Sequence, residues 1–267
     1  MTNTSVYSTT LDQKYFSFID VTTKAWQRLN YNTSLIVVGQ NSTDAAILEQ
    51  IQNGTHTFRR DIDPPTNTVF LPADEYDING NQAFLSQVSR VLCLSCPDEF
   101  PSLNKDGLHI ISDVDMIPLS QKYFDDICNI SEKNKTFVVA SSDAYKEQRY
   151  PMCYLAGTIE QFKQIINPEN LPFKNLVENW YNSMEGDWNT DEIIFTKKFV
   201  NWTGNKTLLE RGWKNTAFGR IAVNRIDRAV PNENYVKVEL SDAIDAHLER
   251  PYDINKNQDL EYHISYE

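Results

Sequence analysis

Short apolar stretches typical of β-strands alternate along this chain with longer amphipathic stretches typical of helices. This alternation restricts the fold more than any other feature of the sequence. Strands are predicted at 5–8, 34–39, 68–71, 108–112, 136–140 and 153–156. Helices are predicted at 16–29, 43–52, 81–96, 158–166, 173–184 and 190–202. Strands separated by helices of this length form a largely parallel sheet with helices on both faces, so we expect an α/β protein.

The chain is predicted to form a single domain. Its 267 residues, 40% of them hydrophobic, are enough to bury a full core. We find no internal repeat, no low-complexity tract and no Gly/Ser- or Pro-rich linker that would separate two folding units. The segment after Ile244 has many polar residues and little apolar periodicity, which predicts a tail wrapped on the outside of the domain.

Acidic residues outnumber basic ones by 37 to 25, which gives a formal charge of −12 and a pI near 4.8. Such a chain repels a phosphate backbone on average, so nucleic acid is not expected as a partner. It can still bind a phosphorylated small molecule if a divalent cation bridges the two sets of negative charge.

The cysteines and the lack of an export or membrane signal predict a cytoplasmic protein with reduced thiols. Four cysteines are too few and too scattered for a disulfide framework in a chain of this length. Cys93 and Cys96 have zinc-like spacing, but no second Cys/His pair follows, so a structural helix is favoured over a metal or redox site. No stretch approaches the roughly 18–20 apolar residues of a membrane span. The amino terminus lacks the basic start and apolar core of a signal peptide.

The most informative segment is Leu108–Leu119, in which an apolar run ends in two carboxylates, Asp113 and Asp115, before Pro118. Proline interrupts strand pairing, so we expect the strand to stop there. Ligands of open α/β sheets bind beyond the carboxyl ends of the strands, where these two side chains are expected. Side chains at i and i+2 of a strand point the same way, so both carboxylates are expected to reach one hard cation. Other acidic pairs occur in a Pro-rich loop and on a predicted helix face, where solvation is expected instead.

Residues Ser112–Leu119 resemble the D-x-D motif of the GT-A nucleotide-sugar-dependent glycosyltransferases. In that family the second acidic residue, and often the first, holds Mn²⁺ or Mg²⁺ against the diphosphate of the donor. The resemblance implies a single GT-A-like α/β domain in which Asp113 and Asp115 bind the cation and, with Val114, contact the nucleotide. A short chain without stem or anchor is similar to members encoded by large algal viruses and microbes.

The resemblance covers most of the chain in order, strongly at the acidic motif and loosely elsewhere. Residues 24–29 and 35–39 are similar to an early helix and the second strand of such enzymes. The other matches imply the following contacts: Thr9, Thr10 and Tyr15 with the base, Arg90 with the nucleotide, Gly157 with the transferred sugar, Arg250 with the diphosphate, and His247 with the metal. Asp191 and Glu192, next to Trp188, resemble the acidic helix start that faces the acceptor.

Each of these residues also has a purely structural interpretation. His247 and Arg250 could be ordinary surface residues, and Gly157 could be a turn glycine. Acidic residues such as Asp191 are favoured in a first helical turn by the helix dipole, whatever their function. Tyr15 could equally belong to the core.

The resemblance implies a Mn²⁺- or Mg²⁺-dependent hexosyl- or pentosyltransferase that moves a sugar from a UDP- or GDP-sugar to a glycan or other hydroxyl acceptor. Residues 1–115 would form the nucleotide-binding half, and residues 116–267 the acceptor half with the C-terminal tail. If the reaction inverts the anomeric centre, Asp191 is the expected base and Glu192 the second candidate. If the reaction retains it, Asp191 would orient the sugar.

Three other functions compete with this interpretation. A sugar-nucleotide pyrophosphorylase needs a Gly-rich, basic loop after the first strand, and residues 9–15 contain no glycine. An aspartyl phosphatase would carry its acidic pair on the first strand, whereas Asp113 is in mid-chain. A catalytically inactive glycosyltransferase-like domain that binds a glycan or a partner stays open, although the intact acidic pair and Asp191 speak against it.

Overall fold

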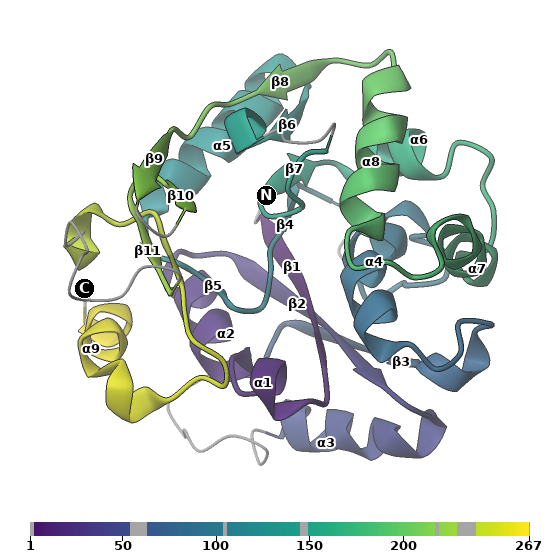
Figure 1. The fold of residues 1–267 in the computed structure, drawn as a ribbon, viewed down its shortest axis with the longest axis horizontal. Helices are drawn as coiled ribbons and strands as arrows, with labels where there is room; N and C mark the ends of the chain where they lie inside the picture. The colour runs from purple at the N-terminus through teal and green to yellow at the C-terminus, as the bar shows by residue number, and fades with distance from the viewer. Residues whose placement is uncertain are drawn as a thin grey trace.

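The computed structural model describes residues 3–53, 63–103, 106–144, 149–216, 219–228 and 239–266. Its main feature is a seven-stranded sheet with strand order β3-β2-β1-β4-β7-β6-β8 (Figure 1). These strands are β1 (Thr4–Thr10), β2 (Asn32–Gly39), β3 (Asn67–Pro72), β4 (His109–Ile111), β6 (Phe137–Val139), β7 (Leu155–Gly157) and β8 (Lys206–Leu208). Neighbouring strands are parallel except at β7, which runs antiparallel to β4 and β6. The predicted α/β class with a largely parallel sheet is therefore confirmed.

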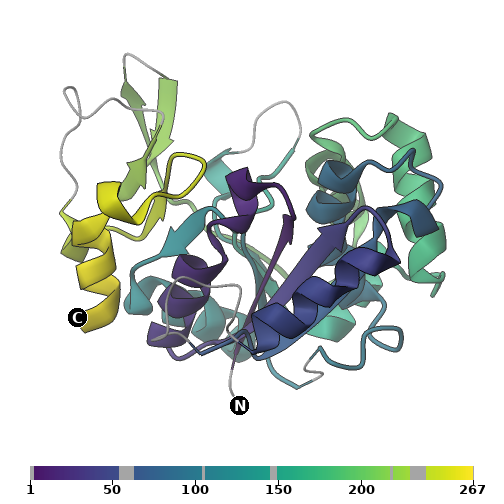
Figure 2. The same cartoon turned by 90° about the horizontal axis from the view of Figure 1, so that it is seen from below.

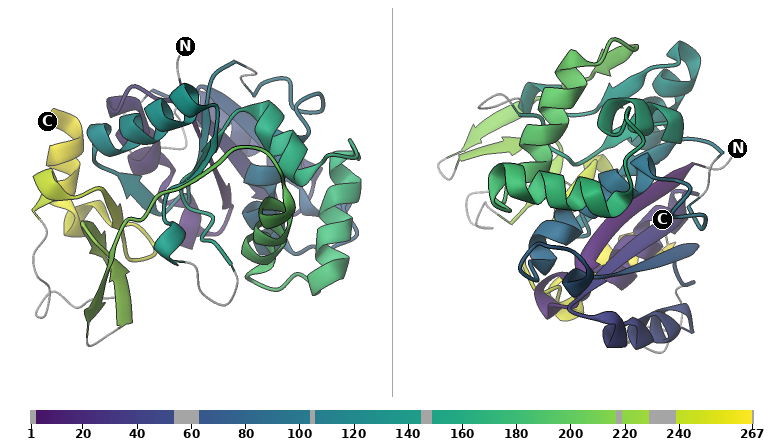
Figure 3. Two further views of the ribbon diagram at one scale, coloured as in Figure 1. Left: turned by 90° about the horizontal axis from the view of Figure 1, so that it is seen from above. Right: turned by 90° about the vertical axis from the view of Figure 1, so that its right-hand side faces the viewer.

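Helices cover both faces of this sheet (Figures 1 and 3). One face carries α4 (Gln82–Ser95), α6 (Ile159–Ile166), α7 (Phe173–Met184) and α8 (Thr190–Asn201). The hydrophobic core on the other face includes residues of α2 (Ile19–Arg28), α3 (Ala46–Gln52), α5 (Gln121–Asn134) and α9 (Gln258–Tyr266). The short helix α1 (Gln13–Phe16) directly follows β1. Short 3-10 helices occupy Ser42–Ala45, Ala73–Glu75, Ser142–Ala144, Leu240–Asp242 and Ile254–Lys256. Among the described helices, none has the length and apolar character needed to cross a membrane.

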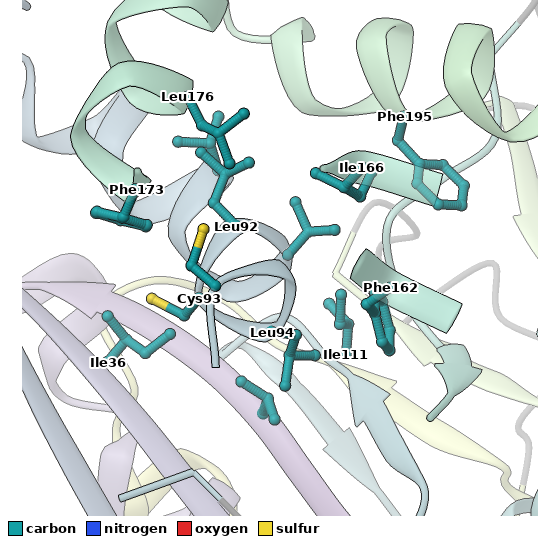
Figure 4. Packing of buried hydrophobic residues seen from close by; sticks show 14 of the residues in the cluster. Ile36, Leu92, Cys93, Leu94, Ile111, Phe162, Ile166, Phe173, Leu176 and Phe195 are labelled. Carbon is teal, nitrogen blue, oxygen red and sulfur yellow. The ribbon is translucent and has the colours of Figure 1, made fainter. Parts of the chain in front are cut away.

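The central strands are buried on both faces, and alternate residues supply two separate cores. Val6 of β1 and Ile111 of β4 pack with α4, whereas Tyr7 and Ile110, each next to one of them in the chain, pack with α2 and α5. Figure 4 shows the first core, where Cys93 of α4 lies near Ile36 of β2 among aliphatic and aromatic side chains. Burial on both sides explains the apolar run at 35–38 of β2. The polar residues buried in β1 are small serines and threonines.

A second, three-stranded sheet brings the C-terminal part of the chain back to the end of β4. It consists of β11 (Arg225–Asp227), β12 (Asp245–His247) and β5 (Met116–Pro118), with β12 in the middle. β12 is parallel to β11 and antiparallel to β5. A hairpin of β9 (Trp213–Thr216) and β10 (Gly219–Ala222) precedes it. Figure 2 shows the C-terminal segment, in yellow, beside the purple N-terminal helices.

A buried ion triad fixes β12 in this sheet. The carboxylate of Asp245, fully buried, accepts hydrogen bonds from Arg211 Nη1 and Nη2 at 2.6 and 2.7 Å. It also accepts hydrogen bonds from Arg225 Nε and Nη2 at 2.9 and 3.1 Å. Losing one partner of such a buried group typically costs about 3–5 kcal/mol, because the remaining charge is left uncompensated. The triad therefore holds the backbone of His247, two residues after Asp245.

All predicted strands and helices appear in the structure, most of them with shifted ends, and the wrapping C-terminal tail contains regular elements that were not predicted. The tail after Ile244 contains β12 within the second sheet and α9 packed on α2, where Lys24 Nζ donates to Ser265 Oγ at 2.8 Å. A three-residue strand is too short to show periodicity, and its pairing is set by distant partners. Cys93 and Cys96 lie buried in α4 and at its C-cap, in keeping with the structural interpretation.

Candidate functional site

A cavity lies where the order of the main sheet reverses. The chain builds β2 and β3 on one side of β1 and then places β4 on the other side. Open α/β sheets bind ligands in the crevice at such a point, beyond the carboxyl ends of the strands. The cavity has a volume of about 670 Å³, which suits a small-molecule site. Its wall includes residues 8–10 at the end of β1 and residues 113–115 just beyond β4.

The cavity brings together predicted site residues that are far apart in the sequence. They come from β1 and the turn after it, α1, α4, the end of β4, the start of α8, and β12 with the chain beyond it. The predicted residues that line the cavity are Thr9, Thr10, Tyr15, Arg90, Asp113, Val114, Asp115, Asp191, Glu192, His247 and Arg250. One surface thus combines carboxylates, guanidinium groups and an imidazole.

Gly157 is the one predicted site residue that the structure places elsewhere. It is the last residue of β7 and pairs with His109, at the start of β4, because β7 runs antiparallel to β4. The opposite end of β7, at Leu155, lies beside the end of β4. A Cβ atom added to Gly157 would lie 2.5 Å from the ring of Phe137. The missing side chain of Gly157 therefore accommodates Phe137, and it leaves no space for a sugar.

The two acidic residues of the motif lie in a turn, which corrects the expectation that they share one side of a strand. β4 ends at Ile111, and Met116 N donates to Asp113 O at 3.2 Å as the chain turns into β5. Pro118, predicted to stop the strand, is the last residue of β5. Because of this turn, Asp113 and Asp115 have different partners.

Asp115 is the buried centre of a cluster of cationic side chains. Its Oδ2 atom accepts hydrogen bonds from Arg228 Nη1 at 2.9 Å and from Arg250 Nε at 2.6 Å, with Arg250 Nη2 at 2.5 Å. His247 Nε2 lies 3.3 Å from the same oxygen. Burial raises the pKa of Asp115. The hydrogen bond and charge of His247 and the charges of both arginines lower this pKa by more, so that it lies well below its ordinary value. Asp115 is therefore ionised at any physiological pH.

Arg90 links Asp113 to Asp191 in the wall of the cavity. Its side chain is buried, and Nη1 donates to Asp113 Oδ1 and to the carbonyl oxygen of Ser112. Nη2 donates to Asp191 Oδ2 at 3.3 Å, and Nε donates to the carbonyl oxygen of Gln87 at 3.3 Å. Most of its hydrogens are thus used by protein acceptors, so Arg90 fixes the positions of Asp113 and Asp191.

Asp191 and Glu192 begin α8 and face the cavity with raised pKa values. Burial raises the pKa of Asp191 to about 6 although Arg90 lowers it, and Asp191 Oδ1 accepts a hydrogen bond from Glu192 N at 2.8 Å. Burial, and then the charge of Asp191, raise the pKa of Glu192 to about 7, against the lowering effect of Arg149. Neighbouring carboxyl groups with pKa values near neutrality are typical of acid–base sites.

The aromatic ring of Tyr15 supports Arg250 at the rim of the cavity. The Arg250 guanidinium lies 4.4 Å from the centre of the ring, and Nη1 donates to Tyr15 Oη at 2.8 Å. Thr9 Oγ1 donates to the carbonyl oxygen of Thr10 at 3.0 Å, and Thr10 Oγ1 accepts from Asp12 N at 3.3 Å. Trp188, 56% exposed, lies in the cavity wall close to the start of α8 and offers an open aromatic face.

Two residues of this site were not found from the sequence, Arg228 and Asp227. Arg228 contacts Asp115, and Asp227 Oδ1 lies 3.6 Å from His247 Nδ1. Asp227 is the last residue of β11, a three-residue strand with no periodicity of its own, and Arg228 directly follows it. Their place beside His247 comes from pairing across the second sheet, which local sequence patterns do not reveal.

Asp115 Oδ2 and His247 Nε2 have a spacing that two ligands of one hard divalent cation could adopt, while Asp115 Oδ2 also accepts hydrogen bonds from Arg228 and Arg250. Asp115 Oδ2 and His247 Nε2 are 3.3 Å apart, and adjacent ligands of an octahedral ion at ~2.1 Å lie about 3.0 Å from each other. Asp113 is held by Arg90 instead. Within the described ranges, no group of three or more His, Cys, Asp or Glu side chains is arranged to hold a metal ion. Ions such as Mg²⁺ commonly use one or two protein ligands and complete their shell with phosphates and water.

No protein-family model and no curated protein matches this chain. Among solved structures, its fold is similar to that of the glycosyltransferase GlyE from Streptococcus pneumoniae TIGR4, with 10% identity and a TM-score of 0.41 over 79% of this chain. The match covers 45% of the GlyE chain, so the present chain spans less than half of that protein. The fold is also similar to apo mouse xyloside xylosyltransferase 1, with 10% identity and a TM-score of 0.42 over 92% of this chain and 97% of that one. The functional argument therefore comes from the cavity itself.

Proposed function

We propose that this protein is a metal-dependent glycosyltransferase that transfers a sugar from a nucleoside-diphosphate sugar to a hydroxyl acceptor. One observation carries the proposal: a single cavity contains a buried carboxylate surrounded by cationic groups and, separately, a pair of carboxyl groups with raised pKa values. The first cluster suits a diphosphate with its cation, and the second suits acid–base chemistry on a hydroxyl group. The sequence resemblance to the D-x-D glycosyltransferases supports the same activity.

The cluster at Asp115 would bind the diphosphate. Asp115 and His247 would hold Mn²⁺ or Mg²⁺, which would supply Lewis-acid stabilisation of the negative charge that grows on the leaving diphosphate. Arg228 and Arg250 donate several hydrogen bonds in a fixed geometry that suits phosphate oxygens. Guanidinium groups placed where charge develops stabilise the transition state without reorganisation.

The cluster at Asp191 would act on the sugar and its acceptor. Arg90 holds Asp191 and Asp113 at fixed positions on the cavity wall. In an inverting reaction, Asp191 would accept the proton of the attacking hydroxyl group, with Glu192 as the second candidate. In a retaining reaction, Asp191 would orient the sugar. The open face of Trp188 would stack on a sugar ring of a glycan acceptor, because aromatic faces pack well against the apolar side of such rings.

A donor screen tests this proposal. Release of nucleotide is measured with UDP-, GDP- and dTDP-sugars, each with Mn²⁺, with Mg²⁺ and with a chelator. We expect one base class to be turned over or slowly hydrolysed with the metal and not with the chelator. The same donor should raise the thermal stability, since a ligand at about 100 times its Kd adds about 2.7 kcal/mol to the free energy of unfolding.

The screen also separates the enzyme from the competing function. Stabilisation by a sugar nucleotide or glycan without any turnover would favour an inactive binding domain. Neither stabilisation nor turnover with any donor would contradict the proposed function.

A further inference from the structure

Three side chains form a row across the second sheet because of its strand register. Asp227 of β11 pairs with His247 of β12, and His247 pairs with Met116 of β5, the residue directly after Asp115. Arg228 N donates to the carbonyl oxygen of His247 at 2.8 Å, which fixes the two strand ends to each other. This pairing brings the imidazole of His247 close to the carboxylates of Asp227 and Asp115.

The two ring nitrogens of His247 face different carboxylates. Nδ1 lies 3.6 Å from Asp227 Oδ1, and Nε2 lies 3.3 Å from Asp115 Oδ2. Asp227 and Asp115 are both buried, with 9% and 3% of their surface exposed. Asp115 lines the cavity, whereas Asp227 is not among the residues of its wall. The ring therefore directs Nε2 to Asp115 in the cavity wall and Nδ1 to Asp227, which lies outside that wall.

We infer that Asp227 is a positioning residue that, when the cation is bound at Asp115, holds the His247 ring with Nδ1 protonated and the Nε2 lone pair directed towards the cation. A histidine that binds a metal through one nitrogen commonly directs its other N–H at a carboxylate, which fixes the tautomer and the orientation of the ring. At 3.6 Å the attraction between Asp227 and Nδ1 is mainly electrostatic, and a small side-chain rotation brings the pair to hydrogen-bonding distance. The inference rests on the proposed function, in which His247 is a ligand of the cation.

Manganese binding to the full chain, followed by water-proton relaxation, tests this role without any turnover. The variants are Asp227→Ala, Asp227→Asn, His247→Ala and the double variant Asp227→Ala/His247→Ala. We expect Asp227→Ala to bind Mn²⁺ about 10- to 100-fold more weakly than the wild type. Asp227→Asn should lose less, because its amide oxygen can still accept a hydrogen bond from Nδ1.

The double variant separates positioning from a general structural effect. If Asp227 acts through His247, the double variant should bind Mn²⁺ no more weakly than His247→Ala alone. Asp242→Asn, at an exposed acidic residue outside the cavity wall, is the matched control and should bind Mn²⁺ as the wild type does. If the losses of Mn²⁺ affinity in the two single variants add up in the double variant, the inference is wrong. It is also wrong if Asp227→Ala binds Mn²⁺ as the wild type does while His247→Ala binds it more weakly. Either result would contradict the role of Asp227 without contradicting the cation site.

Nitrogen-15 NMR of the histidine rings, with and without Mg²⁺, gives a second readout. The chain has four histidines, so the signals of His247 can be assigned from the His247→Ala spectrum. In the metal-free wild type, Nε2 faces the ionised Asp115 as a hydrogen-bond donor, and added Mg²⁺ should shift the ring to the form protonated at Nδ1 alone. A wild-type spectrum that does not change with Mg²⁺ would contradict the cation in the proposed function. An Asp227→Ala spectrum that changes at the same Mg²⁺ concentration as the wild type would contradict the positioning role itself.

Discussion

Replacing Asp115 by asparagine is expected to lower kcat/KM for nucleotide release about 10³-fold, which corresponds to roughly 4 kcal/mol of lost transition-state stabilisation. Asp115 contacts Arg228, Arg250 and His247, so the substitution removes the negative charge that all three share. It also removes one of the two protein ligands proposed for the cation, whose effect on a leaving diphosphate is worth several kcal/mol. Initial rates with the donor identified by the screen give the measurement.

The control for this variant is Asp126→Asn. Asp126 is exposed on α5 and pairs only with Lys122 on the helix surface among the contacts that the structure describes, so its loss should leave the rate unchanged. Both variants should be checked for folding by thermal unfolding before the rates are compared. An Asp115→Asn enzyme that keeps more than about a tenth of the wild-type kcat/KM would contradict the role of Asp115 at the diphosphate.

Replacing Asp191 by asparagine is expected to lower kcat by about 10²- to 10⁴-fold, the usual contribution of a general base. The effect should fall mainly on kcat, because the diphosphate is proposed to bind at Asp115, which contacts Arg228, Arg250 and His247, whereas Asp191 contacts Arg90. Glu185→Gln, exposed on the connection between α7 and α8, is the matched control and should behave as the wild type. If Glu192→Gln abolishes turnover while Asp191→Asn stays active, Glu192 rather than Asp191 is the general base.

The pH dependence of the rate provides an independent check on Asp191 and Glu192. A carboxyl group acts as a base only when it is ionised, and the pKa values of Asp191 and Glu192 are raised to about 6 and about 7. The wild-type kcat/KM should therefore rise with pH across this range and level off above it, with the two groups titrating as a coupled pair. In Asp191→Asn, Glu192 no longer has the neighbouring charge that raises its pKa, so any residual acidic limb should move to lower pH. A flat wild-type profile between pH 5 and 8 would contradict the assignment.

The sequence was sufficient to predict the parts of the molecule that depend on local patterns. The apolar runs that became β2 and β4 are buried on both faces, and their alternation with helices indicated a parallel sheet and the edge at which a site would form. The acidic motif at 113–115 was found because its carboxylates directly follow an apolar strand, whereas Asp191 was found through the resemblance to the GT-A glycosyltransferases.

The rest of the site depends on long-range pairing that no local pattern encodes. Arg228 reaches the cavity, and Asp227 lies beside His247, only because β11 pairs with β12, and β12 in turn with β5. The turn after β4 gives Asp113 and Asp115 different partners, which a strand-based argument could not foresee. Gly157 was misplaced for the same reason, since the antiparallel direction of β7 carries it to the opposite edge of the sheet.

The most direct test of the account is a crystal structure with Mn²⁺ and the nucleoside diphosphate of the preferred donor, read by the anomalous signal of manganese. We expect a manganese peak within ligand distance of Asp115 and of His247 Nε2, with phosphate oxygens on the ion and in contact with Arg228 and Arg250. A nucleotide bound elsewhere on the protein, or an empty cavity at a concentration that saturates binding in solution, would contradict the central claim that this cavity is the donor site.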